Sequence, residues 1–133
     1  MNVRALVQMQ NRRILTIPEG DLEDPDKTIF TMPGGPVEID ETPEQACGRH
    51  LKAQTGLTVK SAIYLYEEYE NGVLTTTYDI DFKMPRYQEE RDAVDARTKF
   101  IRPCHVIKGP QGPYNIGFLK FLYPTNYDDV VKQ

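Results

Sequence analysis

The sequence predicts an α/β fold, because one segment carries both end signals of a helix while several others alternate like β-strands. Thr42 is a good N-cap, and Gln45 completes a capping box with it. Gly56 stands where a left-handed C-terminal cap belongs, so the helix is expected from Pro43 to about Gln54. Residues 73–83 alternate apolar and polar side chains and form the clearest strand.

The remaining segments are assigned by the same signals. Residues 3–10 and 14–17 are expected to pair as a hairpin, and Asn71-Gly72 predicts a second hairpin turn after a strand at 62–66. The other expectations are an acidic loop at 18–28, a strand at 29–32, a glycine turn at 33–35, a helix at 89–97, a strand at 100–107 interrupted by Pro103, and a loose tail after Pro124. Periodicity alone leaves residues 114–123 open between helix and strand.

Bulk composition bounds the function. A chain of 133 residues with 39% hydrophobic and 27% charged residues fits one soluble domain over residues 1–133. A net charge of −4 argues against nucleic acid as a general partner. The sequence has no long apolar run and no signal-peptide pattern, so a cytoplasmic protein without a membrane partner is expected.

The segment around the predicted helix resembles the Nudix box, the signature of the Nudix hydrolase superfamily. The matching residues, at unbroken spacing, are Gly35, Glu41, Arg49, Leu51, Gly56 and Leu57, preceded by Pro33-Gly34. The resemblance implies an α/β/α sandwich with a mixed β-sheet, and it favours a helix for residues 114–123. It also implies hydrolysis of a nucleoside diphosphate linked to another group, with a divalent metal activating water.

Three positions depart from the signature. The helix glutamates that hold the metal in the family are His50, Ala53 and Gln54 here. Magnesium prefers hard oxygen ligands, of which alanine supplies none and glutamine only a neutral carbonyl. The sequence therefore predicts a Nudix-like fold whose inherited catalytic centre is disabled.

The first functional hypothesis is a pseudoenzyme that binds a nucleotide, a nucleoside-diphosphate-linked ligand or a protein partner in the remnant cleft. The cleft residues implied by the resemblance are Gly34, Gly35, Glu38, Glu41, Arg49, His50 and Gln54. Within this set, the resemblance implies a salt bridge between Arg49 and Glu41 that braces the loop against the helix.

Two alternatives stay open at this point. A divergent hydrolase would hold one Mg²⁺ through Glu38 and Glu41 together with Glu89 or Glu90, with Gln54 orienting water; its catalytic candidates are Glu41, Glu38 and Gln54. An interaction module would form a homodimer through exposed strands such as residues 73–83. A charge run like the one containing Glu89 and Glu90 is more often a solvated face.

Four tyrosines have two interpretations. Tyr64, Tyr66, Tyr69 and Tyr78 could form a platform on which bases stack, or they could pack across neighbouring strands. Cross-strand packing is the favoured interpretation for any single one of them.

Overall fold

The computed structural model describes residues 1–132, and the chain divides into two compact units. The first unit contains residues 1–7 and 32–98, and the second contains residues 8–31 and 99 onward. The expectation that one domain spans residues 1–133 stays a prediction. No helix among the described residues is long and apolar enough to cross a membrane.

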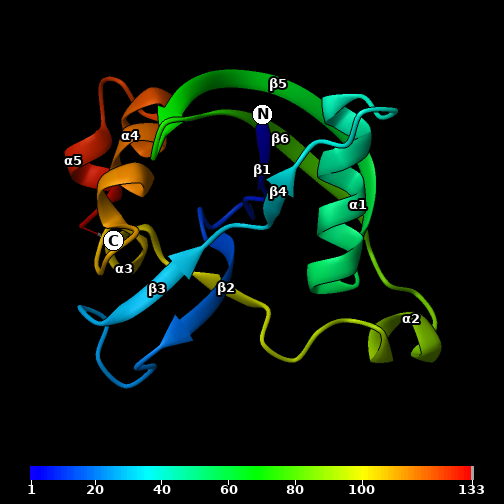
Figure 1. The fold of residues 1–133 in the computed structure, drawn as a ribbon. Coiled ribbons are helices and arrows are strands. Elements are labelled where there is room, and N and C mark those ends of the chain that lie inside the picture. Colours follow the sequence, from blue (N-terminus) through cyan, green and yellow to red (C-terminus); the bar gives the residue numbers. More distant parts are fainter. Residues whose placement is uncertain (133) are drawn as a thin grey trace. The chain divides into compact units, whose positions relative to one another are not determined.

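The first unit contains a four-stranded mixed sheet with one long helix packed on it (Figure 1). Its elements are β1 (Asn2–Leu6), β4 (Gly34–Pro36), α1 (Pro43–Thr55), β5 (Thr58–Glu70), β6 (Val73–Lys83) and α2 (Gln88–Asp92). In the order β4-β1-β6-β5, β1 is antiparallel to β4 and parallel to β6, and β6 is antiparallel to β5. The predicted α/β fold class with a mixed sheet is confirmed.

The second unit contains a three-stranded antiparallel sheet and three helices. Its elements are β2 (Ile14–Gly20), β3 (Thr28–Thr31), β7 (Lys99–Ile101), α3 (Pro103–Val106), α4 (Gly112–Leu122) and α5 (Tyr127–Val130). The strand order is β3-β2-β7. Residues 114–123, left open by periodicity, lie almost entirely in the helix α4, as the family resemblance favoured.

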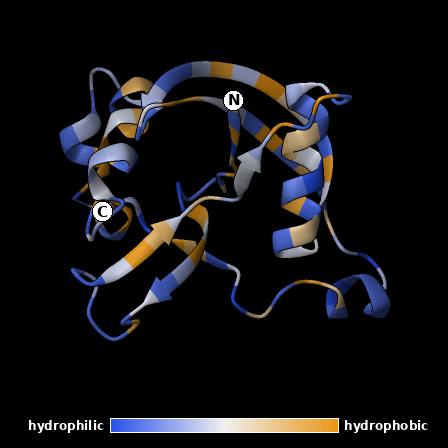
Figure 2. Ribbon diagram, in the orientation of Figure 1, coloured by the Kyte–Doolittle hydropathy of each residue, from blue (hydrophilic) through white to orange (hydrophobic). Residues whose placement is uncertain are grey.

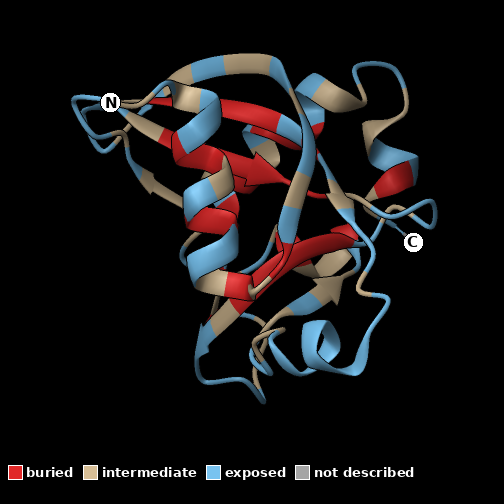
Figure 3. Ribbon diagram, turned by 90° about the vertical axis from the view of Figure 1, so that its right-hand side faces the viewer, coloured by how far each residue is buried: buried red, intermediate tan, exposed pale blue. Residues whose placement is uncertain are grey.

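The end signals of α1 are those the sequence predicts. The Thr42 side chain accepts the Gln45 N–H, the Gln45 side chain accepts the Thr42 N–H, and Gly56 adopts φ +81°. A Cβ at Gly56 would lie 2.0 Å from the Ala93 carbonyl oxygen, so this position requires glycine sterically as well as conformationally. Buried positions alternate with exposed ones along α1 (Figure 3), and Ala46, Cys47 and Leu51 are completely buried.

The first predicted hairpin is wrong. β1 pairs with β4 and β6, whereas β2 pairs with β3 and β7, and one isolated bridge from Gln8 to Ile14 is what remains of the expected pairing. β1 is a central strand of its sheet, between β4 and β6, and it is buried from Val3 to Leu6. β2 also continues past Pro18, a residue that the sequence assigned to a loop. Pro18 has no backbone N–H to donate, but β7 pairs only with Ile14–Thr16, so the β2–β7 ladder ends before Pro18 and loses no hydrogen bond.

Smaller corrections concern element ends. The expected turn at 33–35 contains the start of β4, and a Cβ at Gly34 would lie 2.2 Å from the Val3 carbonyl oxygen. The expected strand at 100–107 ends at Ile101, and Pro103 occupies the first turn of α3, where its missing N–H costs nothing. The expected helix at 89–97 is the shorter α2, whose residues are all hydrophilic (Figure 2). The tail expected to be loose contains α5, with Val130 fully buried.

The strand proposed for dimerisation is a central strand of its sheet. Along residues 75–79, β6 has β1 on one side and β5 on the other, so this stretch has no edge open to a second chain. Dimerisation itself stays a prediction. The Asn71-Gly72 turn between β5 and β6 is as predicted, with φ of +53° and +79° at the two residues. Among the tyrosines, Tyr64 lies opposite Tyr78 and their rings meet edge to face at 6.1 Å, a cross-strand packing contact.

Candidate functional site

The Nudix-box residues of this chain lie in the first unit, on α1 and on the segment from β4 to the helix start. The unit therefore brings together the seven predicted cleft residues, from Gly34 to Gln54. Two kinds of interaction connect them: an ion pair at the loop, and side-chain hydrogen bonds from α1 to the backbone of β4.

The ion pair joins Arg49 to Glu41 through two hydrogen bonds. Arg49 Nε donates to Glu41 Oε2 at 3.0 Å, and Nη2 donates to Oε1 at 2.6 Å. Glu41 Oε1 also accepts the Glu38 N–H at 2.9 Å, and Arg49 Nη2 reaches the Pro36 carbonyl at 3.1 Å. This fork arrangement fixes the loop to the helix, in the bracing geometry that the resemblance implied.

The same contacts set the charge state of the pair. The guanidinium of Arg49, followed by the Glu38 N–H, lowers the pKa of Glu41 to about 2, and hydrogen bonding to Glu41 raises the pKa of Arg49. Glu41 is therefore a carboxylate at neutral pH, and its negative charge is compensated by Arg49. Glu38, whose side chain is 71% exposed, is a looser neighbour, 3.8 Å from Arg49 Nη1.

His50 occupies the first of the three positions that depart from the Nudix-box signature, and its side chain bonds the backbone of β4. Its Nε2 lies 2.8 Å from the Pro36 carbonyl oxygen, and since a carbonyl only accepts, Nε2 is the protonated nitrogen in this contact. The ring also lies directly over Gly35, where an added Cβ would come within 2.6 Å of His50 Cε1. Gly35 thus makes room for the imidazole.

Gln54 occupies the third departed position and pairs with Gly34 in both directions. The Gly34 N–H donates to Gln54 Oε1 at 3.0 Å, and Gln54 Nε2 donates to the Gly34 carbonyl at 2.8 Å. The side-chain amide thereby supplies one acceptor and one donor to the backbone of β4, as the backbone of a neighbouring strand would. A glutamate could satisfy the Gly34 N–H but would place a carboxylate oxygen against the Gly34 carbonyl.

These residues do not fit a magnesium centre on α1. The Nε2 proton of His50 is used by Pro36, Gln54 Oε1 is used by Gly34, Ala53 has no donor atom, and Glu41 is paired with Arg49. Mg²⁺ requires near-octahedral oxygen ligands, usually including one or two carboxylates. Across residues 1–132, no group of three or more His, Cys, Asp or Glu side chains is placed to hold a metal ion.

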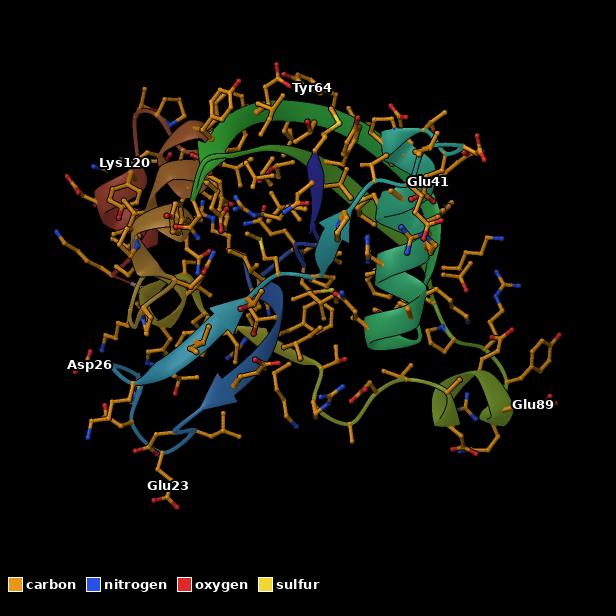
Figure 4. All side chains as sticks on the ribbon, in the orientation of Figure 1. Glu23, Asp26, Glu41, Tyr64, Glu89 and Lys120 are labelled. Carbon is orange, nitrogen blue, oxygen red and sulfur yellow. The ribbon has the colours of Figure 1, made fainter. Side chains whose placement is uncertain are left out.

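The remaining metal candidates are not gathered with the others. Glu41 lies at the N-terminal end of α1, whereas Glu89 lies on α2, beyond the opposite end of the helix (Figure 4). Glu90 accepts the Arg86 N–H at 2.8 Å and lines a small cavity with Lys52 and Gly56, at the C-terminal end of α1. Hydrogen bonding from the Arg86 backbone lowers the pKa of Glu90. A magnesium site shared by Glu38 or Glu41 with Glu89 or Glu90 therefore has no support in this arrangement.

Sequence reasoning missed the bonding role of the departed positions. It treated His50 and Gln54 only as failed ligands. The available signal was chemical: histidine and glutamine both donate, whereas glutamate does not, and both positions face the glycine-rich segment that becomes β4.

Comparisons with known proteins bear on the fold and the family of this chain. The NUDIX domain family matches residues 1–99. No curated protein matches the sequence significantly. Among solved structures, the chain is similar to a Nudix hydrolase family member from Chromobacterium violaceum (21% identity, TM-score 0.54), covering 77% of this chain and 63% of that one.

Two further structures cover almost all of this chain. The E. coli ORF135 protein has 19% identity and a TM-score of 0.60, with 93% of this chain and 91% of that chain covered. A UDP-X diphosphatase has 16% identity and a TM-score of 0.64, with 97% and 62% covered. This chain thus spans less than two thirds of the Chromobacterium and UDP-X diphosphatase chains. Identities this low show the fold alone, but the family match extends over residues 1–99. The chain belongs to the NUDIX domain family.

Proposed function

We propose that this protein is a Nudix-fold binding protein that has lost metal-dependent hydrolysis and takes a nucleotide or a nucleoside-diphosphate-linked compound in the remnant cleft. The observation that carries the proposal is the use of His50 and Gln54 as backbone clamps on β4. An imidazole that donates to a carbonyl and a neutral amide that bonds a backbone segment offer no anionic oxygen to Mg²⁺. The positions have changed from ligands of a metal into supports of the fold.

The ligand class rests on the family and on Arg49. Two of the structures similar to this chain are named as a UDP-X diphosphatase and an ADP-ribose pyrophosphatase from Streptococcus suis, both names that describe a nucleoside diphosphate joined to another group. The Arg49 side chain is 39% exposed, so part of its guanidinium is open to a phosphate of the ligand.

The first experiment separates binding from turnover. Isothermal titration with UDP, ADP, UDP-glucose and ADP-ribose, each with and without Mg²⁺, is run beside chromatographic product detection. We expect saturable binding of at least one compound, no product, and little dependence on Mg²⁺. Arg49→Gln should weaken that binding about tenfold, since charge-assisted bonds to phosphate are among the stronger ones. Arg97→Gln, which removes a comparable exposed pair with Asp95, serves as the matched control.

Two results would contradict the proposal in different ways. Magnesium-dependent product formation abolished by Glu41→Gln would favour the divergent hydrolase. Absence of binding to every compound in the panel would contradict the proposal that the protein binds a nucleotide-like ligand. The interaction module would then be the remaining hypothesis.

A second experiment restores the signature. The triple variant His50→Glu, Ala53→Glu and Gln54→Glu returns three carboxylates to α1 and is expected to gain measurable Mg²⁺ affinity by calorimetry. It should also be less stable than the parent, because two clamps on β4 are lost. A folded triple variant with no gain in Mg²⁺ affinity would show that the departed positions are not what prevents metal binding.

A further inference from the structure

A mainly apolar cavity of about 300 Å³ lies wholly within the second unit. Its lining residues are Pro18 of β2, Leu22 and Pro25 of the β2–β3 loop, Thr28 and Phe30 of β3, Lys99 and Ile101 of β7, and His105 of α3. On the sheet these residues share one face, since Pro18 lies opposite Phe30 and the pairs on β3 and β7 are two residues apart. The volume lies at the lower end of the range for small-molecule sites.

The walls of this cavity are fixed to one another through β3. The Thr28 hydroxyl lies 2.6 Å from the Asp21 carbonyl oxygen and 2.9 Å from that of Asp24, which ties the β2–β3 loop to the strand. Asn115, completely buried on α4, donates one N–H to the Phe30 carbonyl and the other to the Val106 carbonyl, each at 2.9 Å. Because Val106 follows His105, this amide joins the β3 wall to the α3 wall.

A glycine brings a further segment close to the same strand. Gly109 has φ +75°, and a Cβ there would lie 2.1 Å from the Thr28 carbonyl oxygen, so the loop after α3 packs directly on β3. The cavity therefore has walls held by backbone contacts on several sides. A pre-formed site of this kind loses little entropy when it is filled.

The lining offers apolar surface and two polar nitrogen groups. Pro18, Leu22, Pro25, Phe30 and Ile101 are apolar, and the Thr28 hydroxyl is already bonded to the loop. Lys99 supplies a positive charge. Burial, with Arg102, Lys108 and Arg13 nearby, lowers the pKa of His105, so its imidazole is neutral at pH 7 and available for hydrogen bonding.

The acidic residues of the adjacent loop do not line the cavity. Asp21 Oδ1 accepts the Glu23 N–H and Asp24 Oδ1 accepts the Asp26 N–H, so both carboxylates close turns within the loop. The Glu23 and Asp26 side chains point outward from the loop (Figure 4). Lys99 is consequently the only ionised lining group.

We propose that this cavity is a second binding site, for a small planar ring that carries one acidic group. The ring would lie against Phe30 and the prolines, and the acid would face Lys99 and His105. The site lies in the second unit and shares no residue with the Nudix-box residues of the first, so it is tested separately from the proposed function.

The test uses 1-naphthoate as the probe on the full chain. The protein has two histidines, and carbon–proton NMR resolves each ring. Saturable 1:1 binding should shift the His105 signals and leave those of His50 in place. Naphthalene-1-carboxamide, which keeps the ring without the charge, should bind about fivefold more weakly, the effect of roughly 1 kcal/mol for one partly exposed charge pair.

Variants distinguish the residues that bind the acidic group of the ligand from those that contact its ring. Lys99→Gln should weaken naphthoate binding about fivefold and leave the carboxamide unaffected, while Lys27→Gln, an exposed lysine that does not line the cavity, should change neither. Leu22→Ala should weaken both probes, and its 65% exposed side chain can be shortened without unfolding the chain. Unmoved His105 signals at saturating probe, or equal effects of Lys99→Gln and Lys27→Gln, would overturn the proposal.

Discussion

The two faces of α1 differ in how closely they keep the Nudix signature. The face that carries Cys47 and Leu51 is completely buried, and Leu51 matches the signature. The face toward β4 carries His50 and Gln54 in place of two glutamates, yet both side chains are bonded to that strand. The comparison teaches that two parts of the signature can vary independently. The residues that cap and shape the helix are kept, while the residues at two of the glutamate positions bond the backbone of β4.

The buried face should dominate stability. Leu51→Ala removes a fully buried side chain and leaves a cavity, for an expected loss of about 2–5 kcal/mol in the free energy of unfolding. Urea denaturation followed by circular dichroism measures it. A loss no larger than that of the Gln54 variants below would break the comparison, because the β4 face would then support the fold as strongly as the core.

The contact between Gly35 and His50 should give the next largest effect. Gly35→Ala brings a Cβ into the imidazole and is expected to cost about 1–3 kcal/mol. The same change in a His50→Ala background should cost less by about 1 kcal/mol, because the ring is gone and only backbone strain remains. Additive losses in this double-mutant cycle would show that the ring does not occupy the space over Gly35.

The Gln54 amide should have a smaller effect with a distinctive pH dependence. Gln54→Ala leaves the Gly34 N–H and carbonyl without these partners, for an expected loss of about 1–2 kcal/mol. In Gln54→Glu the ionised carboxylate faces the Gly34 carbonyl, so its pKa is raised on folding. The destabilisation should therefore be least below the unfolded pKa of about 4.3 and should grow as pH rises through the folded value. A loss that does not vary with pH would contradict this geometry.

The exposed ion pair should contribute least. The folded pKa of Glu41 is lowered from 4.5 to about 2, so its contribution is present above pH 4.5 and is lost as pH falls toward 2. Comparing the pH dependence of urea unfolding with that of Glu41→Gln isolates this contribution, which solvent screening keeps small. If the free energy of unfolding depends on pH in the same way in both proteins, the ion pair holds the loop in position without adding stability.

Local signals predicted α1 and the β5–β6 hairpin well, because each is specified by neighbouring residues: the Thr42–Gln45 box, the Gly56 cap and the Asn71-Gly72 turn. The partners of each strand were harder to predict. The pairing of β1 with β6 joins residues more than seventy positions apart, and no local pattern encodes it.

The candidate site divides in the same way. The Glu41–Arg49 contact followed from the motif, whereas the clamps of His50 and Gln54 depend on where β4 lies. The cavity of the second unit was not foreseen either, since its walls come from two stretches that lie far apart in the sequence, residues 18–30 and 99–105.

The buried position of Cys47 has a practical consequence for thiol chemistry. Burial, with Glu44 nearby, raises the pKa of the Cys47 thiol to about 12, and the side chain has no access to solvent, whereas Cys104 is partly exposed. Maleimides and disulfide reagents react with accessible thiolates. The native protein should therefore accept a single label, at Cys104, and that label would give a spectroscopic reporter on α3 without any engineered cysteine.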